Sequence, residues 1–238
     1  MNYALVLAGG VGSRMGAGIP KQFIEVDGKP IMIHTLEAFS LHPEIDGIFI
    51  VCIQEWREEL LDCLTRFHVK KVLDVLPQGS DRRESSYIGV KAVFSYSKSP
   101  ENDIVLIHDA ARPLVTEEII SRNIADARRF GACETVCKMT DTVIRSEDGF
   151  AGNIEAIVPR ENLSRVQTPQ SFCLADIMAA HEFYREKLGA EALPEITDDA
   201  GLMLYYGKKV WLTEGSSLNI KLTGKEDIAF FEAIVRRR

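Results

Sequence analysis

Residues 3–16 read Tyr-Ala-Leu-Val-Leu-Ala-Gly-Gly-Val-Gly-Ser-Arg-Met-Gly, in which a short apolar run passes directly into a glycine-rich loop. The run 3–7 has the composition of a buried strand. Small residues after a strand let backbone N–H groups approach a phosphate closely. Arg14 and Lys21 add two cations beside those amides, which suits a triphosphate. The alternative is a plain turn with two solvated cations. The loop lacks the Gly-Lys-Ser/Thr ending of a P-loop, and its glycine spacing does not fit a dinucleotide fingerprint.

Beyond this loop, apolar runs alternate with segments of helical period. We expect strands at 3–7, 47–53, 71–76, 104–107 and 134–138, with helices at 31–41, 55–67, 85–96 and 116–130. Near-continuous apolar strands that alternate with helices are typical of a sheet covered on both faces. The sequence therefore predicts an α/β fold of three layers (αβα) with a mostly parallel, Rossmann-like sheet. Helices at 175–188, 198–206 and 225–236 and a strand at 209–213 are expected to complete it.

The alternation breaks at 140–167, where short β-like pieces at 142–145 and 156–158 flank the turn Ser146-Glu147-Asp148-Gly149. This stretch has too little apolar content for a core of its own. We therefore expect a hairpin arm that protrudes from one domain spanning residues 1–238.

Composition limits the possible functions. The chain has 238 residues, 46% of them hydrophobic and 26% charged, with a net charge of −7. These values fit one folded domain without the basic footprint of a nucleic-acid-binding protein. We expect no secretory signal and no membrane span, since charges interrupt each long apolar run. The odd cysteine count matches no disulfide framework and predicts free, buried or half-buried thiols in a reducing cytoplasm; the cysteines are Cys52, Cys63, Cys133, Cys137 and Cys173.

The motif His108-Asp109-Ala110-Ala111-Arg112-Pro113 follows the most hydrophobic expected strand. Ligands of open parallel sheets bind at the carboxyl ends of strands. A carboxylate there suits Mg²⁺, which prefers one or two carboxylates plus phosphate oxygens. Arg112 could grip an anion with two N–H groups. The alternative is an aspartate that caps the next turn and pairs with Arg112.

Other polar residues carry weaker signals. His34 sits among apolar neighbours and is expected to pack, whereas His42, His68 and His181 are expected at the surface. The adjacent acids Asp198 and Asp199 fit a solvated face.

Taken together, the motifs resemble those of a known family. The run from Leu7 to Gly16 with Pro20-Lys21-Gln22 resembles the signature of nucleotidyltransferases with a glycosyltransferase-A-like fold. The chain as a whole resembles the cytidylyltransferases that act on polyol phosphates, in which four further motifs recur in this order: His108–Pro113, Thr168-Pro169-Gln170, Ile196-Thr197-Asp198 and Asn219-Ile220-Lys221.

The resemblance implies an Mg²⁺-dependent enzyme in which a polyol phosphate attacks the α-phosphorus of CTP and pyrophosphate leaves. Arg14 and Lys21 would stabilise the pentavalent α-phosphate, and Asp109 would hold Mg²⁺. The positions that would frame the cytidine are Ala8, Gly9, Gly10, Gly12, Gly79, Ser80 and Ser85, with Arg82 in the same segment. The nucleophile is already ionised at pH 7, so no general base is required.

By the same resemblance, the residues that would hold or orient the polyol phosphate are Arg112, Thr142, Arg160, Thr168, Thr197 and Lys221. Arg160 and Lys221 would place its phosphate for in-line attack, as catalytic residues. In this family the 140–167 arm crosses to the partner subunit, which implies a homodimer with shared sites.

Two acceptors stay open within the family. Leu7-Ala8-Gly9-Gly10 and the run 168–172 favour D-ribitol 5-phosphate, and Ser80 replaces an acidic residue often found at the base-recognition turn. Ala111 and the run 197–200 favour 2-C-methyl-D-erythritol 4-phosphate, and we give these more weight because Thr197 is expected near the polyol. A non-catalytic nucleotide-binding subunit on the same fold is the alternative of another class, and an NAD-binding oxidoreductase is weaker still.

Overall fold

The computed structural model describes residues 1–10, 19–149, 152–188 and 195–237. Seven strands form a central sheet in the order β11–β7–β10–β6–β1–β4–β5. Their bounds are β1 Asn2–Ala8, β4 Gly47–Cys52, β5 Val72–Pro77, β6 Ile104–Asp109, β7 Ala132–Lys138, β10 Ser164–Cys173 and β11 Trp211–Glu214. All pair in parallel except β10, which is antiparallel to both neighbours. The expected α/β fold with a mostly parallel sheet is confirmed.

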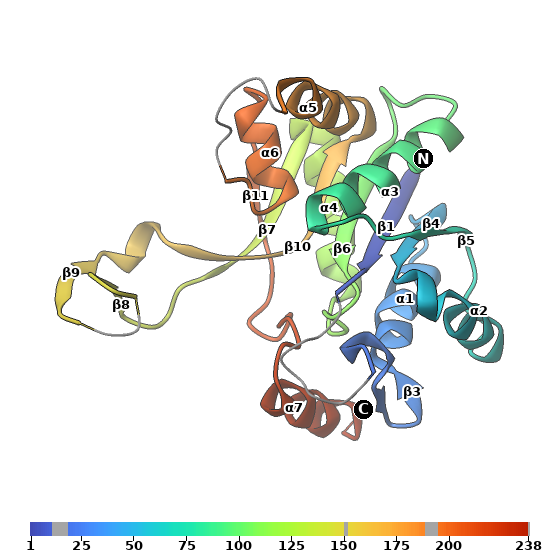
Figure 1. Cartoon of the computed structure of the whole chain (residues 1–238), viewed down its shortest axis with the longest axis horizontal. Coiled ribbons are helices and arrows are strands. Elements are labelled where there is room, and N and C mark those ends of the chain that lie inside the picture. Colours follow the sequence, from blue (N-terminus) through green and yellow to red (C-terminus); the bar gives the residue numbers. More distant parts are fainter. Residues whose placement is uncertain (11–18, 150–151, 189–194, 238) are drawn as a thin grey trace.

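Helices cover both faces of this sheet (Figure 1). One face carries α1 Ile31–Leu41, α2 Arg57–Arg66 and α4 Glu117–Phe130, and the other carries α3 Arg82–Tyr96, α5 Leu174–Lys187 and α6 Asp199–Tyr205. Side chains of a strand alternate between faces. In β1, Ala4 and Val6 accordingly join the core under α1, α2 and α4, while Tyr3 and Leu5 join the core under α3, α5 and α6.

A third, smaller core brings the end of the chain back to its beginning. Helix α7 Lys225–Val235 packs against the two-stranded sheet of β2 Glu25–Val26 and β3 Lys29–Pro30. Phe231 and Leu222 are buried there with Val26 and Ile31. Figure 1 shows α7 beside β3 at one end of the molecule. Three short helical turns complete the described elements, at Lys21–Phe23, Gln54–Trp56 and Arg160–Asn162.

The expected hairpin arm is present. Strands β8 Val143–Ser146 and β9 Ile154–Val158 pair antiparallel and project away from the three layers (Figure 1). The hairpin leaves Ile144, Ile154 and Ile157 exposed, at 48, 64 and 70% of their surface. The predicted arm extends too far at its C-terminal end, because Ser164, Arg165 and Val166 pair with β7 in the central sheet.

Strand β10 was not expected from the sequence. It is rich in polar residues and contains Pro169, both unusual for a central strand. The residues from Gln167 to Ser171 are nevertheless buried. Each of them that has a polar side chain also has a hydrogen-bond partner. Tertiary hydrogen bonds thus replace the apolar pattern on which strand prediction depends.

Three surface predictions are wrong. His42 is buried and hydrogen-bonds through Nε2 to Ser121 Oγ at 3.0 Å. His181 and Asp199 are each 2% exposed and lie together between α5 and α6. Partners distant in the sequence supply hydrogen bonds that offset the cost of burying His42 and Asp199, whereas burial keeps His181 neutral by lowering its pKa to about 4. All five cysteines are free, three of them buried and two half-buried, as expected. Among the described residues, no helix combines the length and apolar character needed to cross a bilayer.

Candidate active site

A cavity of about 440 Å³ opens at the carboxyl ends of β1, β5 and β6. This is the edge at which ligands bind in open parallel sheets. The lining residues are Leu7, Ala8, Gly9, Gly10, Lys21, Gln22, Gln78, Gly79, Ser80, Asp81, Arg82, Ser85, Asp109, Ala110, Ala111 and Lys221. Ten of the expected site residues therefore face one space: Ala8, Gly9, Gly10, Lys21, Gly79, Ser80, Arg82, Ser85, Asp109 and Lys221.

The turn before α3 is built for close approach. A Cβ at Gly79 would lie 2.5 Å from Glu84 Cγ and 2.7 Å from the Glu84 carbonyl carbon, so no other residue fits there without a shift. The Gly79 N–H donates to Ser85 Oγ at 3.0 Å. Asp81 caps α3 by accepting from the Glu84 N–H at 2.7 Å, which starts the helix three residues before the predicted position. The turn is thereby held with its backbone against the cavity.

Two lysines far apart in the sequence reach the cavity through Leu222. Lys21 Nζ donates to the Leu222 carbonyl at 2.9 Å, and the Leu222 N–H donates to the Ala111 carbonyl at 2.8 Å. Next to Lys21, the buried Gln22 amide donates to the Ala8 carbonyl at 2.6 Å. These bonds bring Lys21 and Lys221, the residue before Leu222, to the same cavity wall.

Asp109 lies at the centre of a cationic cluster. Its Oδ2 is 3.0 Å from Lys221 Nζ and 3.3 Å from Arg112 Nε. Burial alone would raise the pKa of Asp109, but the charges of Lys221, Arg82 and Arg112 outweigh it and hold the pKa well below its ordinary value. The carboxylate is therefore charged at neutral pH and able to hold a cation.

A directed chain of hydrogen bonds holds the backbone of Asp109 in place. The Asp109 N–H donates to Thr168 Oγ1 at 3.1 Å, Thr168 Oγ1 lies 3.0 Å from His108 Nδ1, and His108 Nε2 lies 3.2 Å from the Arg112 carbonyl. Burial lowers the pKa of His108 to about 4, so the ring is neutral. Nε2 must carry its proton to reach the carbonyl, which leaves Nδ1 to accept from the Thr168 hydroxyl.

Thr168, expected to contact the polyol phosphate, is thus 4% exposed, and its hydroxyl proton is engaged with His108. Arg112 is fixed similarly, because its Nη1 donates to the Asn219 carbonyl at 2.9 Å while the Asn219 amide donates to the Thr168 carbonyl at 2.9 Å. These contacts join three of the sequence motifs at one edge of the cavity.

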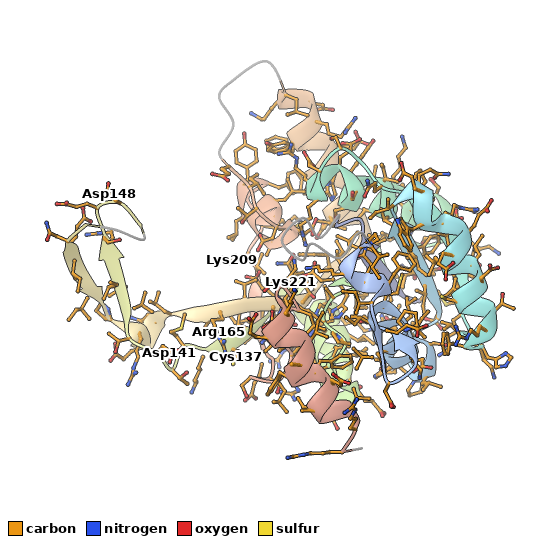
Figure 2. All side chains as sticks on the ribbon, turned by 60° about the horizontal axis from the view of Figure 1, so that its bottom comes forward. Cys137, Asp141, Asp148, Arg165, Lys209 and Lys221 are labelled. Carbon is orange, nitrogen blue, oxygen red and sulfur yellow. The ribbon has the colours of Figure 1, made fainter. Side chains whose placement is uncertain are left out.

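The remaining expected residues lie elsewhere. Thr142 and Arg160 are exposed on the arm, and the Arg160 guanidinium donates to the Thr140 carbonyl. Figure 2 shows Asp141, the neighbour of Thr142, well away from Lys221. Thr197 is exposed just before α6. Gly12 and Arg14 lie outside the described residues.

Sequence reasoning missed Gln22, Gln78 and Asp81, which also line the cavity. Only Gln22 had a signal, because it belongs to the Pro20-Lys21-Gln22 motif. Sequence reasoning also missed Asp199 as the partner of Arg82; Arg82 Nη1 lies 2.9 Å from Asp199 Oδ2.

Behind the site, Glu134 belongs to a half-buried acidic cluster. Gln170 Nε2 donates to Glu134 Oε1 at 2.6 Å and to Asp198 Oδ2 at 3.1 Å. Burial first, and then the charge of Asp198, raise the pKa of Glu134 from its ordinary value of 4.5 to about 7. Between these two values the folded chain keeps a proton that the unfolded chain has released, so this group's contribution to stability falls as pH rises.

We expect Glu134→Gln to raise the melting temperature relative to wild type at pH 8 and to change it little at pH 5. The amide keeps the acceptor for Gln170 and removes the charge that forms at high pH. Thermal unfolding of both proteins at the two pH values measures this. An equal shift at both would show that Glu134 does not titrate in this range.

The fold and this cavity define a nucleotidyltransferase of the α/β class, and comparisons identify its family. The family model described as 2-C-methyl-D-erythritol 4-phosphate cytidylyltransferase matches residues 3–237. A 2-C-methyl-D-erythritol 4-phosphate cytidylyltransferase from Clostridium botulinum (strain 657 / Type Ba4) is 38% identical over 237 residues, 99% of this chain and 98% of the relative. A ribitol-5-phosphate cytidylyltransferase from Vibrio parahaemolyticus serotype O3:K6 is 39% identical over 237 residues, with 99 and 96% covered.

Solved structures agree. The crystal structure of 4-diphosphocytidyl-2C-methyl-D-erythritol synthase from Anaerococcus prevotii DSM 20548 superposes with a TM-score of 0.82 at 28% identity, covering 100% of this chain and 96% of that one. The cytidylyltransferase structure from Thermus thermophilus gives a TM-score of 0.76 at 28% identity, covering 99 and 100%. The chain belongs to the 2-C-methyl-D-erythritol 4-phosphate cytidylyltransferase family. The family and the fold that the sequence resemblance implied are confirmed.

Proposed function

We propose that this protein transfers CMP from CTP to 2-C-methyl-D-erythritol 4-phosphate and releases pyrophosphate. The convergence of Lys21, Asp109 and Lys221 on one cavity beside glycine backbone carries the proposal. The attacking phosphate oxygen is already ionised, so the reaction needs alignment and charge neutralisation rather than a base. The described site fits that need, since its only histidine near the cavity, His108, is buried and neutral.

We assign the nucleotide to the glycine-lined side of the cavity, from Ala8 and Gly10 to the turn at Gly79. Its triphosphate would face the cations, with Lys21 and, by resemblance, Arg14 at the α-phosphate. Lys221 and Arg112 both lie beside Asp109 Oδ2, at 3.0 and 3.3 Å, and are suited to the incoming phosphate. Its polyol would lie toward Thr197, at the start of α6.

Mg²⁺ is proposed as the metal. Asp109 fits it, because a single charged carboxylate among phosphate oxygens is a normal Mg²⁺ environment. Within the described part of the chain, no group of three or more His, Cys, Asp or Glu residues is arranged to hold a metal ion, so phosphate oxygens and water would complete the shell. The bound ion would neutralise phosphate charge. Lys221, now paired with Asp109 Oδ2 at 3.0 Å, would then be available to a phosphate.

We expect Asp109→Asn to weaken Mg²⁺-dependent CTP binding about tenfold or more while the protein still folds. The amide keeps the shape of the side chain but loses the charge that attracts the metal. A calorimetric titration with Mg²⁺ at a fixed CTP concentration measures the effect. An unchanged titration would remove Asp109 from the metal site.

We further propose that residues 1–238 act as one nucleotidyltransferase domain and that the 140–167 arm joins two chains into a homodimer. The exposed Ile144, Ile154 and Ile157 supply apolar surface on the arm. Thr142 and Arg160 lie on the arm and outside the lining of their own cavity, which supports a role in the partner's site. We place the enzyme in the cytoplasm, where five free thiols stay reduced.

The deciding experiment measures pyrophosphate release from CTP and Mg²⁺ with each of two acceptors, 2-C-methyl-D-erythritol 4-phosphate and D-ribitol 5-phosphate. The first should give the higher kcat/KM. D-Ribitol 5-phosphate is the second candidate because the 39% identical Vibrio relative carries that name. A higher kcat/KM with ribitol phosphate would transfer the assignment, and CTP binding without turnover on either acceptor would favour a non-catalytic subunit.

A further inference from the structure

Arg82 is the cation through which α3 reaches the cavity. Its side chain is 32% exposed and belongs to the cavity lining. Among the described residues, its one hydrogen-bond acceptor is Asp199, at 2.9 Å from Nη1 and 117 residues away in the sequence. A guanidinium has five N–H donors in a fixed plane. Fixing one edge of the group against Asp199 therefore sets the direction in which its other donors point.

The Asp199 carboxylate is itself held from several directions. It is 2% exposed, and its Oδ1 accepts from Ser86 Oγ at 2.5 Å. Ser86 lies one turn after Arg82 on α3, so both contact the carboxylate from the same helix face. The Asp199 N–H donates to Gln170 Oε1 at 3.1 Å, which ties the start of α6 to β10.

His181 closes the remaining side from α5, with Nε2 at 3.7 Å from Asp199 Oδ1. Burial lowers the pKa of His181 to about 4, so it adds no charge there. Arg82 is consequently the cation that balances Asp199. Burial lowers the pKa of Arg82, but Asp199 and Asp109 raise it by more, and the guanidinium stays charged.

A buried ion pair adds little net stability, because the cost of removing two charges from water offsets their attraction. Its effect is on geometry. Here the pair joins two segments. One is the turn before α3, which carries Gly79 and Ser80, and the other carries Thr197, two residues before Asp199. The charges of Asp109 and Asp198 also raise the pKa of Arg82. Without Asp199, the guanidinium would lose the contact that sets its direction at the cavity.

We propose that Asp199 is a positioning residue that holds the Arg82 guanidinium in the orientation that receives CTP. The role rests on the proposed function only in taking CTP as the ligand. It concerns ground-state binding, so its loss should raise the KM for CTP while kcat changes only a few-fold.

Calorimetry of CTP binding with Mg²⁺, without any polyol phosphate, tests the proposal. Asp199→Asn should weaken CTP binding about tenfold, the loss of one well-oriented charge-assisted contact. Arg82→Met should weaken it at least as much. In the Arg82→Met background, adding Asp199→Asn should cause no further loss, because Asp199 acts through Arg82. Ser86→Ala keeps the charge and should weaken binding about two- to threefold, in the same direction.

Asp103→Asn is the matched control. Asp103 is also 2% exposed, accepts from a serine hydroxyl, Ser97, at 2.5 Å, and pairs with a cation, the Met1 amino group, at 2.7 Å. It lies at the opposite end of β6 from Asp109. This variant, made without an N-terminal tag, should lose stability but bind CTP as wild type does.

Unchanged CTP affinity in Asp199→Asn, or a further loss of equal size in the Arg82→Met background, would overturn the role of Asp199. Equal weakening by Asp103→Asn would do the same, because the effect would then be one of general stability. A wild-type protein that binds no CTP would instead overturn the proposed function together with this role. The two failures are therefore distinguishable.

Discussion

Replacement of Lys21 by alanine is expected to lower kcat about 100-fold or more, with only a few-fold change in the KM for CTP. Negative charge builds on the α-phosphate oxygens as the acceptor attacks, so a cation held there stabilises the transition state more than the bound substrate. The Leu222 carbonyl holds Lys21 Nζ at the cavity at 2.9 Å, which limits the reorganisation needed during the reaction. Steady-state kinetics with CTP varied at saturating acceptor separate kcat from KM.

Lys29→Ala serves as the control for this prediction. Lys29 lies in the same part of the chain and is paired with Glu37 at 2.7 Å, away from the cavity lining. Its loss should leave both constants near wild type. A kcat for Lys21→Ala within a few-fold of wild type would reduce Lys21 to a structural contact with Leu222.

The second large effect concerns the arm. Arg160→Ala and Lys21→Ala chains should each be inactive alone, and their mixture should regain activity. If Arg160 serves the partner's cavity, a mixed dimer has one site with Lys21 from one chain and Arg160 from the other. Random mixing makes about half of the dimers mixed, each with one intact site, so about a quarter of wild-type activity should return.

Arg145→Ala gives the comparison on the same arm. Arg145 is exposed and pairs with Glu155 across the β8–β9 hairpin at 3.0 Å. This variant should stay active by itself. Native mass measurements show whether mixed dimers have formed. If they have, and activity does not rise above that of the separate variants, Arg160 does not act across the interface.

The sequence was a good guide to the fold wherever apolar burial sets the structure. Strands β1, β4 and β6 are buried along nearly their whole length, and their apolar runs predicted them. The arm was predicted because its residues lack such runs. Strand β10 was missed because its buried segment is held by hydrogen bonds, such as that of Ser171 to Asn123 at 2.9 Å. Local sequence contains no trace of partners so distant.

The same distinction holds for the site. Residues carried by motifs could be assigned before the structure was known: Asp109 because a strand was expected to end just before it at the edge where ligands bind, and Gly79 through the family resemblance. The partners that set their orientation could not. Asp199 looked like a surface acid next to Asp198, and only the packing of α6 on α3 and β10 turns it into the partner of Arg82. Likewise, only the position of His108 shows that the Thr168 hydroxyl is engaged in a buried hydrogen bond.

The contact between Lys21 and Leu222 has a consequence for folding during synthesis. It joins positions 201 residues apart, and the C-terminal segment that makes it packs through Phe231 on Ile24, Val26 and Ile31. A chain emerging from the ribosome completes β1, β4, β5 and β6 long before that segment exists. CTP, as a ligand of the finished cavity, therefore has no complete site to stabilise until Lys221 and Leu222 have been added. Protection by CTP against proteolysis should then report full-length, fully folded chain rather than a folded N-terminal portion.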